Sequence, residues 1–560
     1  MRPMSNDTRV GFSLIDEPWI LVRFRGSGVR EVSLRDVFLR AAGIVDIVGE
    51  VPTQTFAIVR LLLAIVHGSQ RPVEEPDVEW KRLWDSSEPL LSAVEGYFEK
   101  YRDRFDLLDP ARPFYQVAGL STSSGEISAL DKLIADVPNG EPFFTTRLKS
   151  GIDRISFAEA ARWLVHCQAF DSSGIKSGAV GDKRAKGGKG YPIGTAWAGS
   201  LGGLLIEGKN LRETLLLNLT FGDGDGEPFA DGDLPVWERG VLGPDEEERG
   251  VPQGPADLYT WPSRRIRLAH DGHQVFGVII SNGDPLKAQL VQGVHNLEPM
   301  TAWRRSETQE KALKSDHHIY MPLTHRPERA MWRGLSALLP QAVREQQYKD
   351  GSKNLPALSF DWVGKMSDRG TLPRELLRTR AIGMEYGSQS ATVAEIVDDS
   401  LTMDSILLGQ RGKDLADLAI GAVEQTDTAV FQLGVLARNL AIAKGGEPDG
   451  PGDRLREQAY FALDAPFRTW LSKLGQATDV LAAREDWYST ARSELLKLAR
   501  QAVDASGPSA WVGRISSRTG KPVNSPEAFG WFLRELYRAM PDGRQSEEPT
   551  ADDDKMEAVL

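Results

Sequence analysis

Four segments in the last third of the sequence constrain the fold most, because their apolar residues recur at the spacing of a helix. They run over Thr426–Ala443, Arg454–Leu474, Asp479–Ala505 and Ser525–Met540. Apolar residues three and four positions apart lie on one face of a helix, and that face must be buried against a neighbour. Short breaks between such helices are typical of antiparallel packing, so the pattern predicts a four-helix bundle over residues 391–540. Residues 541–560 are acidic and lack aromatic side chains, so we expect a disordered tail.

Residues 1–390 mix helical and strand patterns. Thr53–His67 is apolar around most of a helical turn, which predicts a buried helix. Ser156 is followed three residues later by Glu159, a capping box that predicts the start of a second helix. The stretch Leu258–Ile280 predicts strands, including an extended segment over residues 259–261. The sequence therefore predicts an α+β fold, in which a large mixed N-terminal domain (1–390) precedes the helical bundle.

Composition narrows the class of protein. The chain has 560 residues, a net charge of −12 and a hydrophobic content of 41%, which is typical of a soluble globular protein and not of a free-standing DNA-binding protein. A single cysteine, Cys167, excludes a disulfide framework and a multi-cysteine zinc site. The start lacks a signal-peptide pattern, and the most apolar window is too short to cross a bilayer. We expect a cytoplasmic protein with no membrane partner.

One segment, Gly174–Gly190, combines glycine with positive charge. It holds six glycines and five cations, and a single acidic residue, Asp182, opposes them. Glycine allows close backbone approach to a ligand, and cations attract phosphate. No apolar periodicity runs through the segment, so it predicts a loop that docks onto nucleic acid. The alternative from composition alone is a flexible, solvated connector, since Gly/Lys-rich loops are common.

A nucleotide- or phosphate-binding enzyme that uses this loop is a competing hypothesis, and a purely structural scaffold is another. A P-loop would need a glycine where Lys183 stands and Ser or Thr where Gly190 stands, and a dinucleotide fingerprint would need a glycine at Ile193. No Ser-His-Asp order, paired carboxylates or cofactor motif is evident. His317, His318 and His325 lack the spacing of a zinc site. We therefore predict no catalytic residue, no cofactor and no metal.

Two further loops carry unusual residue combinations. Phe143 and Phe144 are adjacent and precede Thr145 and Thr146. Adjacent side chains of an extended segment point to opposite faces, so one aromatic ring is available to stack on a base; the alternative is that both are core contacts. Residues 364–370, GKMSDRG, predict a second exposed basic loop bounded by glycines.

Taken in order, these pieces resemble the CasA family, the large subunit of the type I-E CRISPR surveillance complex Cascade. The resemblance covers nearly the whole chain. It rests on LIDEPWILV at the start, the helix Thr53–His67, Leu130-Asp-Lys-Leu133 before the Phe-Phe-Thr-Thr loop, the Gly/Lys segment ending in Gly190-Tyr-Pro-Ile, Leu211–Leu219, Leu234-Pro-Val-Trp-Glu238, and Gly383-Met-Glu-Tyr-Gly387 before a helical bundle.

The resemblance implies positions for the family's contacts with nucleic acid. Its glycine loop, which approaches the protospacer-adjacent motif (PAM) of target DNA, corresponds to the segment 178–190. The residues concerned are Gly178, Gly181, Lys183, Arg184, Lys186, Gly187, Gly188 and Lys189. Its minor-groove lysine corresponds to Lys287, and the wedge that splits the duplex falls at Lys365, Met366 and Arg369. Its contact with the complex near the crRNA 5′ end corresponds to Phe143, Phe144, Thr145 and Thr146.

The resemblance also implies a function and partners. It implies a non-catalytic subunit that recognises the PAM of double-stranded target DNA, helps to open the duplex and provides a platform for a helicase-nuclease. The expected partners are the other Cascade subunits, the crRNA 5′ end region, the target DNA and that helicase-nuclease. Glycine backbone plus a cation suits relaxed reading of the minor groove, while guide pairing reads the sequence.

Overall fold

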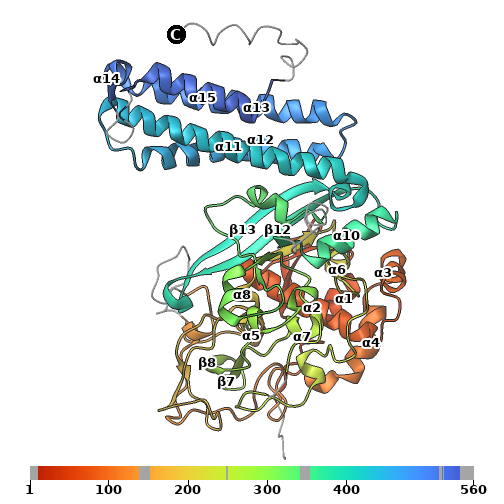
Figure 1. The fold of residues 1–560 in the computed structure, drawn as a ribbon. Helices are drawn as coiled ribbons and strands as arrows, with labels where there is room; N and C mark the ends of the chain where they lie inside the picture. The colour runs from red at the N-terminus through yellow and green to blue at the C-terminus, as the bar shows by residue number, and fades with distance from the viewer. Residues whose placement is uncertain are drawn as a thin grey trace, which may run out of the picture. The chain divides into compact units, whose positions relative to one another are not determined.

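The chain divides into two units, which the computed structural model describes over residues 10–137, 145, 152–247, 250–340, 353–515, 520 and 522–542 (Figure 1). The first unit comprises Met1–Met331, Ala337–Pro373 and Leu377–Leu401, and the second comprises Trp332–Ser336, Arg374–Leu376 and Thr402–Leu560. Helix and sheet both contribute to the first unit, and long helices dominate the second. The predicted α+β class with a C-terminal helical region is confirmed.

The first unit is built around helix α2 (Pro52–Gln70), whose residues from Thr53 to Gly68 are all buried. Helices α4 (Leu91–Lys100), α5 (Phe157–Phe170) and α7 (Pro255–Tyr259) pack against it. Helix α5 begins as predicted, since the Ser156 hydroxyl accepts a hydrogen bond from the Glu159 amide at 3.1 Å. The same unit also contains the helices α1 (Leu34–Arg40), α3 (Pro76–Asp85) and α6 (Leu211–Asn218).

The strands of this unit form small antiparallel sheets. β1 (Ile20–Phe24) lies between β2 (Val29–Val32) and β3 (Ile44–Ile47). β12 (Leu376–Tyr386) lies between β6 (Gly203–Glu207) and β13 (Val393–Asp404), and β7 (Arg264–His270) pairs with β8 (Val275–Asn282). β9 (Trp303–Arg305) lies between β10 (Tyr320–Pro322) and β11 (Asn354–Leu355). The elements α8 (Glu307–Leu313) and α10 (Leu358–Asp368) are short helices.

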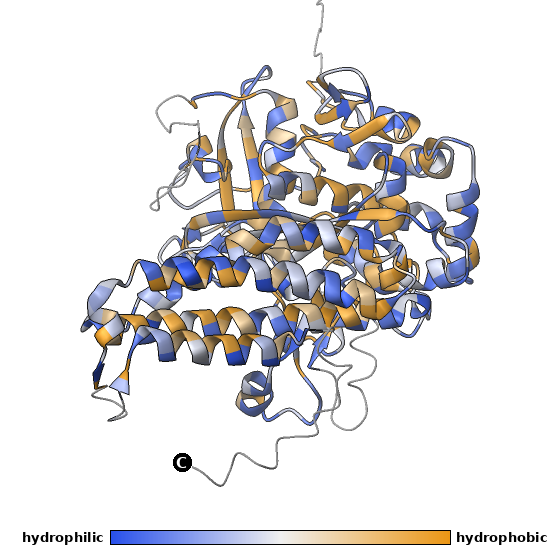
Figure 2. Cartoon of the chain, turned by 90° about the horizontal axis from the view of Figure 1, so that it is seen from above, coloured by the Kyte–Doolittle hydropathy of each residue, from blue (hydrophilic) through white to orange (hydrophobic). Residues whose placement is uncertain are grey.

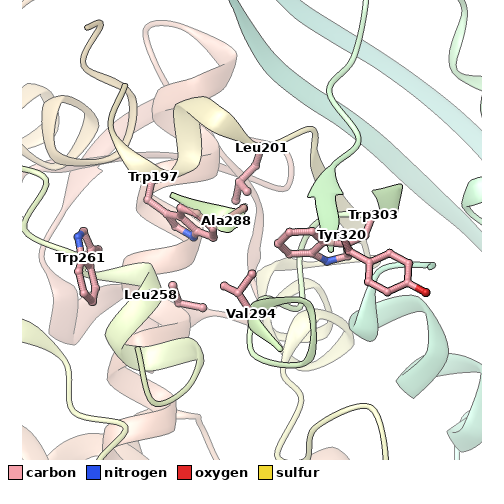
Figure 3. Close-up of a cluster of buried hydrophobic side chains, with 8 residues drawn as sticks. All are labelled: Trp197, Leu201, Leu258, Trp261, Ala288, Val294, Trp303 and Tyr320. Atoms are coloured by element: carbon pink, nitrogen blue, oxygen red, sulfur yellow. The ribbon is translucent and has the colours of Figure 1, made fainter. Parts of the chain in front are cut away.

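A buried ion pair joins α2 to the neighbouring aromatic core. Arg60 Nη1 lies 2.7 Å from Glu298 Oε1, and Trp197 Nε1 donates to Glu298 Oε2 at 2.7 Å. Trp197 belongs to the cluster of buried side chains drawn in Figure 3, together with residues such as Leu258 and Trp261. Both charges are removed from water, so each depends on the other for its stability.

The segment 259–261, predicted as extended, instead ends the helix α7. The reason is a distant partner: the Asp233 carboxylate accepts hydrogen bonds from the Ala256 and Asp257 amides at 3.1 and 2.8 Å. These contacts satisfy amide groups at the helix N-terminus that have no acceptor within the helix. Asp233 lies more than twenty residues away in the sequence, so the local pattern carried no sign of it.

The second unit is a bundle of four long helices. They are α11 (Lys413–Lys444), α12 (Pro451–Leu474), α13 (Val480–Asp504) and α15 (Ser525–Ala539), and α11 packs against the other three. The short helix α14 (Gly507–Val512) and the hairpin of β14 (Arg514–Ile515) and β15 (Pro522–Val523) lie between α13 and α15 in the sequence. Hydrophobic and hydrophilic residues recur along each of these helices (Figure 2). This pattern is expected of helices that bury one face.

The boundary of the bundle lies later than residue 391, where the sequence pattern placed it. Residues 393–404 form β13, which pairs with β12, and the first long helix begins only at Lys413. The Thr379 hydroxyl donates to the Leu401 carbonyl at 2.9 Å, and Arg380 Nε lies 2.6 Å from Asp398 Oδ1. Strand pairing with residues about twenty positions earlier therefore decides the structure of this segment.

We expect buried His67 to make folding sensitive to acid. His67 on α2 contacts the rings of Phe221, Phe229 and Tyr259, and burial lowers its pKa from 6.5 to about 3. Between these values the unfolded chain binds a proton that the folded chain does not, so stability is lost as pH falls below 6.5. The contribution is about 1.4 kcal/mol per pH unit.

Urea unfolding at pH 7 and pH 5, for the wild type and for His67→Phe, measures this contribution. The aromatic replacement suits the surrounding rings and does not titrate, so the loss of stability on acidification should be smaller in the variant. Equal losses in both proteins would contradict a neutral, buried His67.

Candidate nucleic-acid interface

The Gly/Lys segment folds as a tight hairpin. β4 (Lys176–Ser177) pairs antiparallel with β5 (Lys189–Gly190), and the Gly178 amide donates to the Gly188 carbonyl at 2.9 Å. A two-residue turn joins Lys186 to Lys189, whose amides and carbonyls bond each other at 2.9 and 3.1 Å. The turn residues Gly187 and Gly188 have φ of +58° and +71°, which only glycine adopts without cost. The segment is therefore a defined structure and not a flexible connector.

A buried salt-bridge cluster holds the base of this hairpin. Asp171, which ends α5, lies 2.6 Å from Lys176 Nζ and 2.5 Å from Arg264 Nε. Burial alone would raise the pKa of Asp171, but the two cations outweigh it and lower that pKa. Arg264 also donates to the Ser172 carbonyl at 2.9 Å and to the Gly194 carbonyl at 2.8 Å. One guanidinium thus ties together the chain entering and the chain leaving the hairpin.

Arg184, predicted to contact DNA, is instead held inside the hairpin. Its guanidinium donates to Asp182 Oδ1 at 3.0 Å, to Glu246 Oε2 at 3.0 Å and to the Gly283 carbonyl at 2.9 Å. Its side chain is 26% exposed. The sequence pattern groups Arg184 with the lysines because all carry positive charge, whereas the acceptors Glu246 and Gly283 come from segments about 60 and 100 residues away.

Three lysines between β4 and the end of the glycine turn are exposed, unlike Lys176 at the base of the hairpin. The Lys183 side chain is 90% exposed, and its Nζ lies 3.3 Å from Asp245 Oδ2. Lys186 and Lys189 flank the glycine turn, are exposed, and make no ion pair with the described residues. Two ammonium groups thus flank a turn whose glycines leave the backbone open to close approach, and Lys183 adds a third positive charge three residues before Lys186. Positive charge beside an open backbone is the combination that a phosphate-bearing ligand requires.

Lys287 follows directly on the segment that supports the hairpin. β8 ends at Asn282, whose side-chain amide donates to the Tyr191 carbonyl at 2.6 Å, and the next carbonyl, that of Gly283, binds Arg184. Lys287 is exposed and precedes the short 3-10 turn Ala288–Leu290. The predicted minor-groove lysine therefore lies in the segment that follows the contact between β8 and the hairpin.

The predicted loop over residues 364–370 is wrong, because most of it belongs to helix α10. Met366 is 1% exposed and therefore is not available for insertion into a duplex. Lys365 pairs with Asp361 at 3.1 Å one turn earlier, and Arg369 pairs with Asp77. The buried residues Phe360, Val363 and Met366 recur at helical spacing, a signal that becomes visible only when the stretch before Gly364 is included.

The aromatic loop falls largely outside the described residues. This holds for Phe143, Phe144 and Thr146, whose predicted contact with the complex stays a prediction. Thr145 is described, and its hydroxyl donates to the Asp136 carbonyl at 2.9 Å.

Comparison with known proteins identifies the family. The family described as CRISPR-associated protein Cse1 matches residues 13–498 of this chain. The chain belongs to the Cse1 family. A CRISPR-associated protein CasA/Cse1 of Thermus thermophilus is 28% identical over 548 residues, covering 94% of this chain and 98% of that protein.

Solved structures agree with this family in fold. Cse1 of Thermobifida fusca is 44% identical, with a TM-score of 0.86 over 96% of this chain and 100% of that one. Cse1 of Acidimicrobium ferrooxidans is 30% identical, with a TM-score of 0.78 over 95% and 98% of the two chains. A chain of a CRISPR RNA-guided surveillance complex, 18% identical, shares the fold with a TM-score of 0.64 over 89% of this chain and 99% of that one.

Several residues that shape the hairpin of this Cse1-family protein carried no sequence signal. The hairpin is held in place by Asp171, Arg264 and the acidic loop of residues 243–247. Each of these lies in a stretch whose sequence pattern is that of an ordinary helix, strand or polar loop. Charged residues are common at such positions, and only the fold brings them together. A buried arginine on a strand, as at Arg264, becomes recognisable only when its burial is known.

Within the described ranges, no group of three or more His, Cys, Asp or Glu side chains is arranged to hold a metal ion. His325 bonds the Gly203 carbonyl at 2.9 Å, while His317 and His318 pair with Asp316 and Glu310. No helix in the described part of the chain has the length and apolar character needed to cross a bilayer.

Proposed function

We propose that this protein is the large, non-catalytic subunit of a type I-E CRISPR RNA-guided surveillance complex and that it recognises the PAM of double-stranded target DNA. Membership of the Cse1 family supports the place in such a complex. The observation that supports the DNA-binding role is the β4–β5 hairpin, where exposed Lys186 and Lys189 flank a Gly187-Gly188 turn and exposed Lys183 precedes it.

The hairpin suits a minor groove better than a major groove. The minor groove distinguishes A·T from G·C but carries little further information, so a reader there needs close backbone approach and positive charge more than a set of specific side chains. The two glycines lack side chains that would keep the turn away from the base edges. Lys186 and Lys189 then contact the phosphates on either side, and Lys287 adds a third cation from the adjoining segment.

We also propose that this protein helps to open the duplex beside the PAM. With Met366 buried, the remaining positions of the predicted wedge are Lys365, which is partly buried, and Arg369, which is exposed, both near the end of α10. Both are already paired with carboxylates, so opening through them requires an exchange of partners. The unstacking of each base step costs roughly a few kcal/mol, which these contacts must offset.

The partners follow from the same role. We propose that Phe143, Phe144, Thr145 and Thr146 contact the complex near the crRNA 5′ end, and that the assembled subunit offers a platform to a helicase-nuclease in the cytoplasm. A net charge of −12 suits a subunit that docks onto a basic RNA–protein assembly, while the local lysines serve the DNA.

The proposal is tested by assembling the complex with and without this subunit. Binding is measured on a duplex with the PAM, a duplex with a mutated PAM, and a PAM duplex already unpaired beside the motif. We expect the subunit to be required for tight binding of the paired PAM duplex and to matter less for the pre-opened one. Equal binding of all three duplexes with and without the subunit would contradict the proposal, and ATP hydrolysis by the isolated protein would favour an enzyme.

A further inference from the structure

We propose that Arg184 is a positioning residue: it fixes the tip of the β4–β5 hairpin to the segment that leads to Lys287 and makes no contact with DNA phosphate. This inference rests on the proposed function, because it assigns roles among the cations of the same DNA-binding surface. The lysines attract DNA, whereas Arg184 holds those lysines in position.

The donors of Arg184 are already occupied. Nε donates to Asp182 Oδ1 at 3.0 Å, and Nη1 donates to both Glu246 Oε2 at 3.0 Å and the Gly283 carbonyl at 2.9 Å. Nη2 donates to the Asn282 carbonyl at 3.3 Å and to Asp182 Oδ2 at 3.4 Å. A phosphate could reach this guanidinium only by displacing protein acceptors. The exposed lysines face no such competition from backbone carbonyls.

The chemistry of arginine explains why this position holds one. A guanidinium presents five donors in a rigid planar fork, whereas a lysine ammonium is a single flexible point. Here the fork bridges three chain segments: the hairpin through Asp182, the acidic loop through Glu246, and the end of β8 through Asn282 and Gly283. The Asp182 side chain, 1% exposed, also accepts from the Arg184 amide at 2.9 Å, which anchors the arginine to its own turn.

The acidic loop of residues 243–247 is itself fixed to the end of β8. Buried Arg265 donates to the Gly243 carbonyl at 2.8 Å and to Asp284 Oδ1 at 2.6 Å. The Glu247 amide donates to the same Asp284 carboxylate at 3.0 Å. The acidic loop is therefore anchored to the end of β8, and Arg184 joins the hairpin tip to both, beside the contact of Lys183 with Asp245.

The consequence is a fixed separation between the lysines of the glycine turn and Lys287. Without the Arg184 link, the hairpin stays held at its base by Arg264 and at Val180 by the hydrogen bond from its amide to the Ser121 carbonyl, but among the described residues only the contacts of Lys183 with Asp245 still join its tip to the acidic loop. Binding then costs more ordering of the tip, while the number of phosphate contacts is unchanged. A phosphate contact and a positioning residue thus differ in the salt dependence of binding, since that slope counts the phosphates neutralised.

The experiment compares Arg184→Gln, Arg184→Lys and Lys186→Gln in the assembled complex, using the paired PAM duplex between 50 and 200 mM salt. We expect both Arg184 variants to weaken binding by roughly 2- to 30-fold at every salt concentration, with the slope of the wild type. Lys186→Gln should lower that slope by about 0.9. The inference is overturned if Arg184→Gln lowers the slope and Arg184→Lys restores it, or if both variants bind like the wild type.

A second measurement decides the inference without DNA. Amide hydrogen exchange of the free subunit reports on the Lys186 and Lys189 amides, which close the glycine turn. Both Arg184 variants should accelerate exchange in the hairpin, and Lys186→Gln should not; unchanged exchange in the Arg184 variants overturns the positioning role. If Lys186→Gln leaves the salt slope unchanged while the Arg184 variants loosen the hairpin, the proposed DNA contact fails and the positioning role stands.

Discussion

Replacing Lys183, Lys186 and Lys189 together with alanine should greatly weaken the binding of PAM-containing duplex by the assembled complex and flatten its dependence on salt. Each lost phosphate contact lowers the log–log slope by about 0.9, so the triple variant should lose roughly 2.7. Binding measured between 50 and 200 mM salt gives both quantities. Melting of the free subunit should be unchanged, because exposed charges contribute little to stability.

A control uses two exposed lysines, Lys311 of α8 and Lys314, the residue that follows this helix. Their replacement by alanine removes positive charge outside the proposed DNA surface, so it should leave the salt slope unaltered. If the control and the hairpin variant lose affinity equally, the effect belongs to net charge and the hairpin has no special role. Arg184 is left in place in both variants, since its removal would alter the shape of the hairpin as well as its charge.

Replacing Glu298 with alanine should be among the most destabilising single changes in the protein. Glu298 is fully buried, Arg60 beside it is 2% exposed, and Trp197 Nε1 would also lose its acceptor. Removing one member of a buried ion pair leaves an uncompensated charge, which costs about 3–5 kcal/mol. Urea denaturation followed by circular dichroism measures the loss.

Two comparisons make that result specific to the buried charge. Glu307→Ala removes an exposed carboxylate paired with Lys311 and should have little effect on unfolding. The double variant Arg60→Met with Glu298→Leu removes both charges and should be more stable than Glu298→Ala alone, because no charge is left unpaired. A Glu298→Ala protein as stable as the wild type would mean that water reaches Arg60.

The dependence of folding stability on pH and the binding of DNA should be separable by substitution, because they depend on different residues. His67, whose low pKa links stability to pH, lies on α2 among aromatic rings, whereas the proposed DNA contacts are the lysines of the β4–β5 hairpin. His67→Phe should therefore change the pH dependence of unfolding without changing the affinity for DNA at pH 7.

Local patterns in the sequence determined most of the secondary structure and the family. The buried helix α2, the capped helix α5, the long helices of the bundle and the Gly187-Gly188 turn each depend on residues within a few positions of one another. Helical spacing, a capping box and a glycine turn are short-range effects, so they can be recognised without a fold. The ordered set of such segments likewise indicates the family.

Only the tertiary structure decides which charged side chains are held by acceptors of the protein and which segments pair as strands. Arg184 and the lysines beside it look alike in the sequence, but only Arg184 meets Glu246, Asn282 and Gly283, which lie about 60 to 100 residues away. Met366 is buried because α10 extends before Gly364, and β13 is a strand because β12 lies beside it. Hydrogen bonds and burial depend on which distant groups are brought within a few ångströms, and a linear pattern does not contain that information.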